Sequence, residues 1–298
     1  MEKLIITVAV DCVVSFPNNP YKIPGEQVDR VVEEYVRAVE AGAAITHIHG
    51  VRRLDPQIQP DGRKVSRLDV DGWRRMQEGI QSRCDAVMQF GIAAARLEER
   101  KKVMALGPDM MSVIFGPHDE CFQPDPSIPA NEIYATHTRD ELLEYVDVLE
   151  KFEIRPEIEC FSTGAFWNID FVRRRAALPS PLLCTLFFGW PGGTWTPATP
   201  KALSFMLDYL PADCVWNISV QDVHAHWGLM AQAILQGGHV RVGWEDNPYV
   251  EPGVFARNNA MLVQKVKDLA HSLGREVATA DEARQILALP AARTVARG

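Results

Sequence analysis

The chain has 298 residues, of which 47% are hydrophobic and 23% are charged, and its formal net charge is −8. This composition is typical of a globular protein with a large core. The acidic balance argues against a nucleic-acid partner, because a broad basic surface is needed to displace phosphate counterions. No apolar stretch approaches the length that spans a bilayer, so we also expect no membrane partner.

The cysteines and the N-terminus indicate a cytoplasmic protein. No C-X-X-C pair occurs, and the residues at the start of the chain show no signal-cleavage pattern. The cysteines lie mostly in or beside apolar runs, as small core residues do in a reducing compartment. They are Cys12, Cys84, Cys121, Cys160, Cys184 and Cys214.

Short apolar runs alternate with longer amphipathic runs along the chain, which predicts repeated β-α units. The expected strands are residues 4–10, 43–49, 86–90, 110–114, 155–160, 182–188, 215–220 and 239–243. The expected helices are residues 26–41, 70–82, 94–106, 139–151, 166–177, 200–209, 226–236, 254–273 and 281–289.

This alternation predicts one α/β domain over residues 1–298, a (β/α)8 TIM barrel with a C-terminal helical extension. An open doubly wound sheet is the alternative, but no G-X-G-X-X-G follows the first strand. Two long connections interrupt the pattern. Residues 52–67 could act as a lid, and the proline-rich residues 116–138 read as an extended or subunit-facing loop.

His47 and His49 end the second expected strand. Alternating side chains in a strand would put both imidazoles on one face, about 7 Å apart. A metal site needs a third ligand. Glu245 just follows the eighth strand, and a barrel brings both strand ends to the same face. Ordinary core or surface histidines are the alternative reading, and His224 with His226 is a second, less favoured H-X-H pair.

Polar residues also mark other strand ends. Glu157 and Glu159 alternate with apolar residues on the fifth strand, where an inward carboxylate could be a general base or the ion-pair partner of Arg241. The turn at residues 189–194 contains Gly192 and Gly193, whose N–H groups could approach a phosphate or an oxyanion. The basic runs 100–102 and 173–175 read as solvated helix faces, with an anionic ligand as the alternative.

Several segments together resemble the beta-keto acid cleavage enzymes over nearly the whole chain. They are residues 7–10, 42–49, 156–159, 189–193, 237–247 and 278–287. The resemblance implies a homo-oligomeric barrel, a dimer or tetramer, with one Zn²⁺ per chain. It also implies conversion of a β-keto acid and acetyl-CoA into acetoacetate and a new acyl-CoA.

Carried over by position, the resemblance implies roles for six residues. His47, His49 and Glu245 would be the zinc ligands. Glu159, Arg241 and Asp246 would be the catalytic polar groups, and the base could be either Glu159 or Asp246.

The chain departs from the family pattern where members bind the keto acid's carboxylate. Residues 89–92 read Gln-Phe-Gly-Ile in place of Ser-Thr-Gly-Gly, and residues 112–114 read Ser-Val-Ile in place of Thr-Leu-Asn. With Phe90 and Ile114 at these positions, the usual binding of the keto acid's carboxylate is in doubt. The expected substrate-binding residues are Gln89, Gly91, Ser112, Gly192 and Gly193.

Val13 and Val14 occupy the place after the first strand where family members often have an acidic residue, which can bind a substrate amino group. An aminated substrate is therefore not expected. Aromatic residues near the strand ends favour an apolar or bulky substrate side chain. A quaternary ammonium group in an aromatic cage is the alternative.

Two other functions compete with this one. A zinc hydrolase, or an aldolase or lyase that does not use CoA, would share the metal site. A diverged barrel that binds metal without catalysis would explain the lost anchor.

Overall fold

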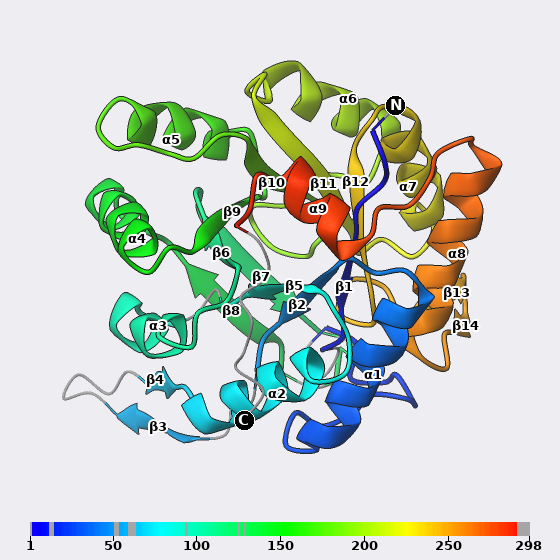
Figure 1. Cartoon of the computed structure of the whole chain (residues 1–298), viewed down its shortest axis with the longest axis horizontal. Coiled ribbons are helices and arrows are strands. Elements are labelled where there is room, and N and C mark those ends of the chain that lie inside the picture. Colours follow the sequence, from blue (N-terminus) through cyan, green and yellow to red (C-terminus); the bar gives the residue numbers. More distant parts are fainter. Residues whose placement is uncertain are drawn as a thin grey trace.

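The computed structural model describes residues 2–11, 15–50, 54–58, 64–92, 95–123, 126–127 and 129–290. Eight parallel strands form a closed barrel, which Figure 1 shows end-on inside its ring of helices. The barrel strands are β1 (Ile6–Ala9), β2 (Ile45–Ile48), β5 (Val87–Phe90), β6 (Met110–Ile114), β9 (Arg155–Cys160), β10 (Leu182–Phe188), β11 (Cys214–Val220) and β12 (His239–Val242). The predicted TIM barrel is confirmed.

Helices follow the strands and cover the outside of the barrel. They are α1 (Val28–Ala41), α2 (Val70–Gln81), α3 (Leu97–Met104), α4 (Arg139–Lys151), α5 (Gly164–Arg173), α6 (Pro200–Tyr209), α7 (His226–Leu235), α8 (Asn259–Ser272) and α9 (Ala280–Ile286). The apolar faces of α1 to α8 pack on the outward side chains of the strands in one continuous core. Within the described residues, none of these helices is long and apolar enough to cross a membrane.

The helix expected over residues 254–273 is shorter than predicted. Its first two residues instead form β14 (Val254–Phe255), which pairs with the preceding β13 (Tyr249–Glu251) in a small antiparallel hairpin. Gly253, with a φ of 82°, makes the turn between these strands. The helix begins only after Asn258, whose side chain accepts a hydrogen bond from the Met261 N–H.

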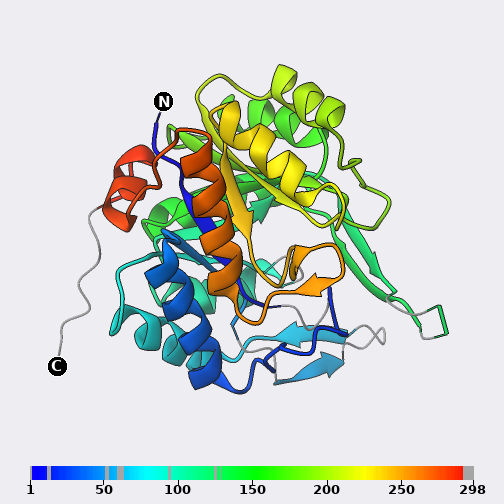
Figure 2. The same ribbon diagram turned by 90° about the vertical axis from the view of Figure 1, so that its right-hand side faces the viewer.

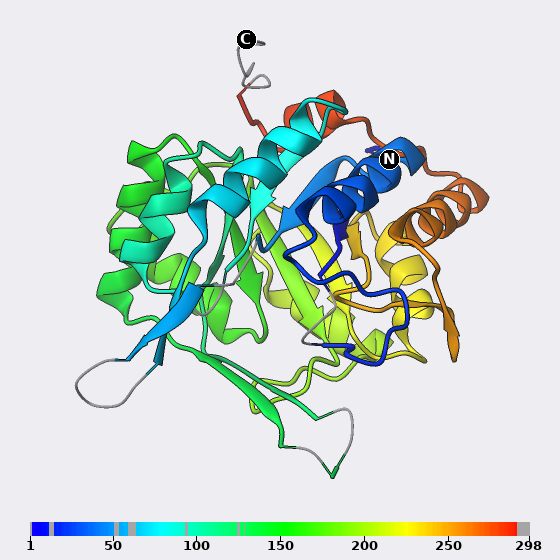
Figure 3. The ribbon, with the colours of Figure 1, turned by 90° about the horizontal axis from the view of Figure 1, so that it is seen from below.

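The two long connections contain hairpins, so the prediction of simple loops was wrong. β3 (Leu54–Ile58) pairs with β4 (Lys64–Arg67), and β7 (His118–Phe122) pairs with β8 (Asn131–Ala135). Buried and more exposed residues alternate in β7, as they do in a strand with one buried face. Figure 3 shows both hairpins at the end of the barrel opposite to α9, the short red helix.

The α9 helix closes the other end of the barrel. Its Ala283 and the following Leu287 pack against inward side chains from the first residues of the strands, among them Ile45, Val87 and Met110. In Figure 2 this helix lies beside the N-terminal segment, away from the two hairpins. Among the described residues, this packing fills the end of the barrel at the first residues of the strands, so a site for a ligand is expected at their C-terminal ends.

Candidate active site

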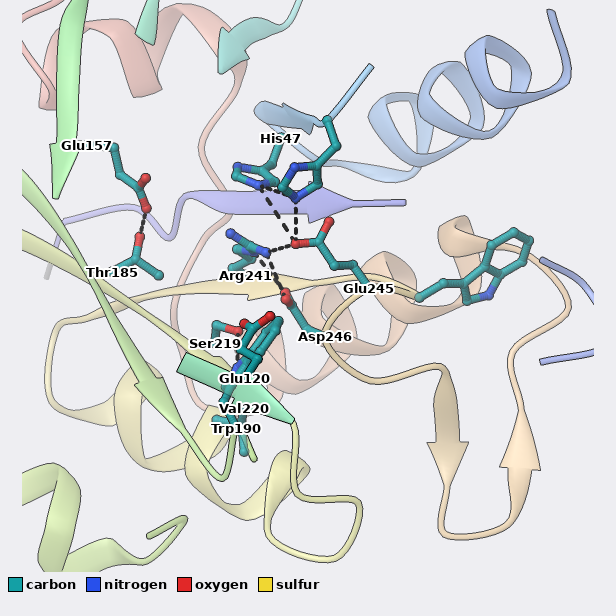
Figure 4. A network of polar contacts seen from close by, with 12 residues as sticks. His47, Glu120, Glu157, Thr185, Trp190, Ser219, Val220, Arg241, Glu245 and Asp246 are labelled. Carbon is teal, nitrogen blue, oxygen red and sulfur yellow. Dashed lines mark hydrogen bonds and ion pairs between the residues drawn. The ribbon is translucent and has the colours of Figure 1, made fainter. Parts of the chain in front are cut away.

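His47, His49 and Glu245 bring three potential ligand atoms together at the C-terminal end of the barrel. The two Nε2 atoms lie 3.2 Å apart, and Glu245 Oε1 lies 3.0 Å from His49 Nε2 and 3.8 Å from His47 Nε2. Figure 4 shows His47 and Glu245 turned toward each other across β1. Within the described residues, these three side chains form the one group of three or more His, Cys, Asp or Glu residues that could hold a metal ion.

The donor set fits a divalent transition metal. A four-coordinate zinc with bonds of about 2.0–2.2 Å holds its ligand atoms roughly 3.3–3.5 Å apart, close to the spacing seen here. Burial, with Arg241 nearby, lowers the pKa of His47 well below its usual value, so this imidazole is neutral. Burial raises the pKa of Glu245, but His49 and Arg241 outweigh it, and the net pKa is low. Neutral imidazoles and a carboxylate are the ligand forms that a metal requires.

Arg241 lies directly beneath this group. Its Nε and Nη2 atoms donate to the two carboxylate oxygens of Asp246 at 3.0 and 2.9 Å, and Nη2 also contacts Glu245 Oε1. The guanidinium is 2% exposed, and Asp246 and Glu245 keep its pKa raised in spite of burial. The charged arginine therefore fixes the carboxylates of Glu245 and Asp246 in one arrangement (Figure 4).

Three further carboxyl groups near Arg241 are hard to ionise. Burial raises the pKa of Asp246 to about 7, although Arg241 opposes the shift. Burial and the neighbouring Glu157 raise the pKa of Glu159 to about 8. Burial also raises the pKa of Glu157, to which the Thr185 hydroxyl donates a hydrogen bond. Groups with pKa values near 7 and 8 can exchange protons at neutral pH.

A pocket opens over these groups. Both polar side chains and aromatic rings line it. Its residues are Asp11, Ser15, His49, His118, Glu120, Phe122, Ile133, Glu159, Phe161, Phe187, Trp190, Arg241 and Glu245. Glu159 thus faces the pocket, whereas Asp246 is fully buried behind Arg241. A possible metal site, an arginine and carboxyl groups with raised pKa values around one pocket suit chemistry on a carbonyl compound.

A family model described as beta-keto acid cleavage enzyme matches residues 3–289. The chain belongs to this family. It is 33% identical over 294 residues to the 3-keto-5-aminohexanoate cleavage enzyme of Fusobacterium nucleatum subsp. nucleatum, covering 97% of this chain and 99% of that protein. It is 28% identical to the 3-dehydrocarnitine:acetyl-CoA trimethylamine transferase of Rhizobium meliloti, covering 87% and 88% of the two chains.

Among solved structures, the ternary complex of ObcA with C4-CoA adduct and oxalate has the same fold. The TM-score is 0.67 at 19% identity, over 91% of this chain and 68% of that chain. The resemblance seen in the sequence is confirmed, and the chain is an enzyme of the beta-keto acid cleavage type.

The residues expected to bind substrate occupy different places in this beta-keto acid cleavage enzyme. Gln89 and Ser112 are buried inside the barrel, where Ser112 lies beside Glu157 on the neighbouring strand. Gly91 lies against the His47 imidazole, since a Cβ there would come within 2.3 Å of His47 Cε1. Glycine at this position thus makes room for the imidazole.

The amides of the glycine turn are directed at the β7–β8 hairpin. The N–H of Gly193 donates to the Asp119 carboxylate, and the N–H of Thr194 donates to its Oδ1 at 2.9 Å. Gly192, with a φ of 147°, lies so close that a Cβ would be 1.9 Å from the Asp119 carbonyl oxygen. These glycines hold a neighbouring segment of the enzyme.

Phe90, which the sequence placed at the substrate-carboxylate anchor, does not line the pocket. Its ring packs on Trp73 of α2, 4.6 Å between centroids, on the outer side of the barrel. Because side chains alternate along a strand, Gln89 points inward and Phe90 points outward. Ile114 does lie at the mouth side, in the cluster that contains Phe122, Phe161 and Phe187.

Several pocket residues were not found from the sequence. His118, Glu120 and Asp11 line the pocket, yet their strand and loop carry no recognised motif. Side chains two residues apart in a strand point to the same face. The spacing of His118 and Glu120 was therefore the signal that could have identified them as neighbours on one face. Val13 and Val14 lie outside the described residues, but the acidic Asp11 after β1 does reach the pocket.

The competing motifs have other roles. His226 is buried and its Nδ1 lies 2.7 Å from the Val220 carbonyl oxygen, whereas His224 is exposed.

The basic run at residues 100–102 is only partly a solvated helix face. Arg100 is fully buried and donates to the Ser112 carbonyl oxygen. Arg173 pairs with Asp213 at 2.8 Å on the surface.

Proposed function

We propose that this enzyme holds one zinc ion at His47, His49 and Glu245 and exchanges acyl groups between a β-keto acid and acetyl-CoA. The products would be acetoacetate and a new acyl-CoA. The single observation that carries the proposal is the convergence of two imidazoles and a carboxylate, 3.0 to 3.8 Å apart, beside Arg241 and under a pocket. The name of the Rhizobium meliloti relative, which specifies acetyl-CoA, supports this co-substrate.

Zinc bound to these ligands would supply Lewis acidity to the ketone oxygen and so make the adjacent C–H bond more acidic. Arg241 keeps Glu245 ionised and in place, and its charge also stabilises negative charge that develops in the pocket. Asp246 holds the guanidinium through two hydrogen bonds and so fixes its orientation.

The proton leaves the α-carbon of the β-keto acid for a carboxylate of this site. Glu159 lines the pocket, whereas both oxygens of Asp246 are bound to Arg241. Access therefore favours Glu159 as the acceptor. With a pKa of about 8, Glu159 also holds the proton firmly enough to return it later in the cycle.

The remaining bonds change in two stages. The α-carbanion forms a C–C bond to the acetyl carbonyl carbon, and the C–S bond of acetyl-CoA breaks to release CoA thiolate. The thiolate then attacks the original ketone carbon, and the C–C bond between that carbon and the α-carbon breaks. The acyl group leaves on CoA, and the α-carbon takes up a proton as part of acetoacetate.

The pocket supports an apolar or bulky substrate side chain rather than an aminated one. Phe122, Phe161, Phe187 and Trp190 line it, each no more than 6% exposed. Such rings favour burial of hydrocarbon. Assembly as a homo-oligomer and localisation in the cytoplasm both stay predictions. Sedimentation of the purified enzyme tests the oligomeric state.

A panel of β-keto acids with and without acetyl-CoA tests the proposal. We expect acetoacetate and a matching acyl-CoA to form in equal amounts, only with acetyl-CoA, and to stop when a chelator removes the metal. Cleavage at an equal rate without acetyl-CoA would instead identify a lyase or hydrolase. A protein that neither retains zinc nor turns over any acid after zinc is added would be a non-catalytic barrel.

A further inference from the structure

One face of β7 forms a wall of the active-site pocket. His118, Glu120 and Phe122 alternate along the strand, are 4%, 7% and 5% exposed, and all line the pocket. Asp119 and Cys121 point to the other side of the strand. We call His118, Glu120 and Phe122 the β7 face.

The β7 face is held in place from behind. Asp119 accepts hydrogen bonds from the N–H groups of Gly193 and Thr194, and the Cys121 N–H donates to the Pro191 carbonyl oxygen at 3.0 Å. Gly192 allows the two backbones to approach closely, because any side chain there would collide with Asp119. The hairpin is therefore fixed to the turn that follows β10.

His118 lies beside the carboxylate of Glu120, although neither of its ring nitrogens makes a hydrogen bond to a described residue. Its Nε2 lies 3.2 Å from Glu120 Oε1, and its ring packs edge-on against Phe161 with 3.9 Å between centroids. Glu120 is neither one of the three candidate metal-binding residues nor one of the Arg241 partners described above. A carboxylate next to the aromatic side chains of this pocket accepts hydrogen bonds, and a ligand in the pocket can supply the donor.

The arrangement of the rings selects among possible donors. Phe161 stacks on Phe187 at 4.2 Å, and the Arg241 guanidinium carbon lies 5.5 Å from the Phe187 centroid. With His118 against Phe161 as well, both rings are already in contact with other groups. They do not form the open cage that holds a quaternary ammonium group. An anionic side chain would be repelled by the Glu120 carboxylate. A neutral hydroxyl can donate to this carboxylate and brings no charge among the aromatic rings.

We propose that Glu120 determines specificity by accepting a hydrogen bond from a hydroxyl on the side chain of the β-keto acid, with the apolar part of that side chain against Phe122. Asp119 is a positioning residue for this contact. The inference rests on the proposed acyl exchange and adds a substrate class to it: a β-keto acid with a hydroxyl-bearing, otherwise apolar side chain.

Three acids of matched length test the inference, with a methyl, a hydroxyl or an ammonium group at the same side-chain carbon. We expect kcat/KM for the hydroxy acid to exceed that for the other two by about ten-fold or more, since a hydrogen bond to a charged group contributes this much. In Glu120→Leu the preference for hydroxyl over methyl should disappear. Glu120→Gln, which keeps an acceptor oxygen, should retain part of it.

Glu132→Leu is the matched control, because Glu132 lies on the paired strand of the same hairpin but is exposed. This variant should keep the preference. Asp119→Ala should raise KM for the hydroxy acid much more than it lowers kcat, and Asp119→Asn should restore part of the loss. An equal fall of kcat and kcat/KM in Asp119→Ala would indicate a merely structural role and overturn the positioning.

Calorimetric binding of the same three acids to the zinc-loaded protein gives a readout without turnover. A hydroxyl preference in binding that Glu120→Leu abolishes would support the inference even if acetyl-CoA exchange failed. Preference for the ammonium acid, or a hydroxyl preference unchanged in Glu120→Leu, would overturn it even if the exchange proceeded.

Discussion

Arg241 and Asp246 are joined by two hydrogen bonds, Nε to Oδ2 at 3.0 Å and Nη2 to Oδ1 at 2.9 Å. Both side chains are almost completely buried, and the same guanidinium contacts Glu245. Residues 242–245 separate the two along the chain, and among them Gly243, with a φ of 146°, lets the backbone lie against Ala9. The ion pair and the Arg241–Glu245 contact therefore connect Glu245 to β12.

Arg241→Met should destabilise the enzyme by about 3–5 kcal/mol, because it leaves the buried carboxylates of Glu245 and Asp246 without their cation. Arg241→Lys keeps the charge but loses the planar fork, so it should fold better than the Met variant and still lose most activity. Urea unfolding and steady-state rates measure the two effects. Wild-type rates in Arg241→Lys would show that the charge alone suffices.

His49→Ala should remove one of three ligands and abolish stoichiometric zinc binding. Elemental analysis of the purified protein after dialysis against zinc provides the measurement. His224→Ala is the control, since His224 belongs to the other H-X-H pair and is exposed. Equal zinc loss in both variants would contradict the assigned site.

Glu159→Gln should retain zinc and lose turnover by about 10²- to 10⁴-fold, the usual contribution of a general base. Exchange of the substrate α-proton with deuterium from solvent, followed by NMR, reports the proton transfer itself. Exchange that persists in Glu159→Gln but stops in Asp246→Asn would transfer the role to Asp246.

The rate should depend on pH through Glu159. Its carboxylate must be ionised to accept a proton, and burial with Glu157 raises its pKa to about 8, so kcat/KM should rise with pH until this group is deprotonated. A bound divalent cation nearby favours the carboxylate and places the observed pKa below that value. Glu157→Gln removes a like charge and should shift the profile to lower pH. A shift to higher pH would contradict this coupling.

Leu287→Ala tests the closure of the barrel by α9. Leu287 is 1% exposed and packs on inward side chains of the strands, so its truncation should cost about 2–5 kcal/mol of unfolding free energy. Gln285→Ala, at an exposed position of the same helix, should change stability little. Urea midpoints compare the two variants.

Most secondary structure could be predicted from local pattern. The β9 and β10 bounds, and those of α4 and α6, agree with the expected ranges because hydrophobic period and caps are properties of neighbouring residues. The β7–β8 hairpin was missed because Pro124, Pro126 and Pro129 suggested a loop throughout, whereas these prolines lie between the two strands. The pattern around a turn does not reveal which strands it joins.

The sequence by itself determined the barrel and the pairing of His47 and His49 with Glu245, because strand alternation and barrel topology dictate where strand ends meet. Only the tertiary structure decided that Phe90 packs outward on Trp73, that Gly193 binds Asp119, and that His118 and Glu120 line the pocket. These contacts join residues far apart in the chain. Their formation depends on strand stagger and hairpin placement, which local periodicity does not encode.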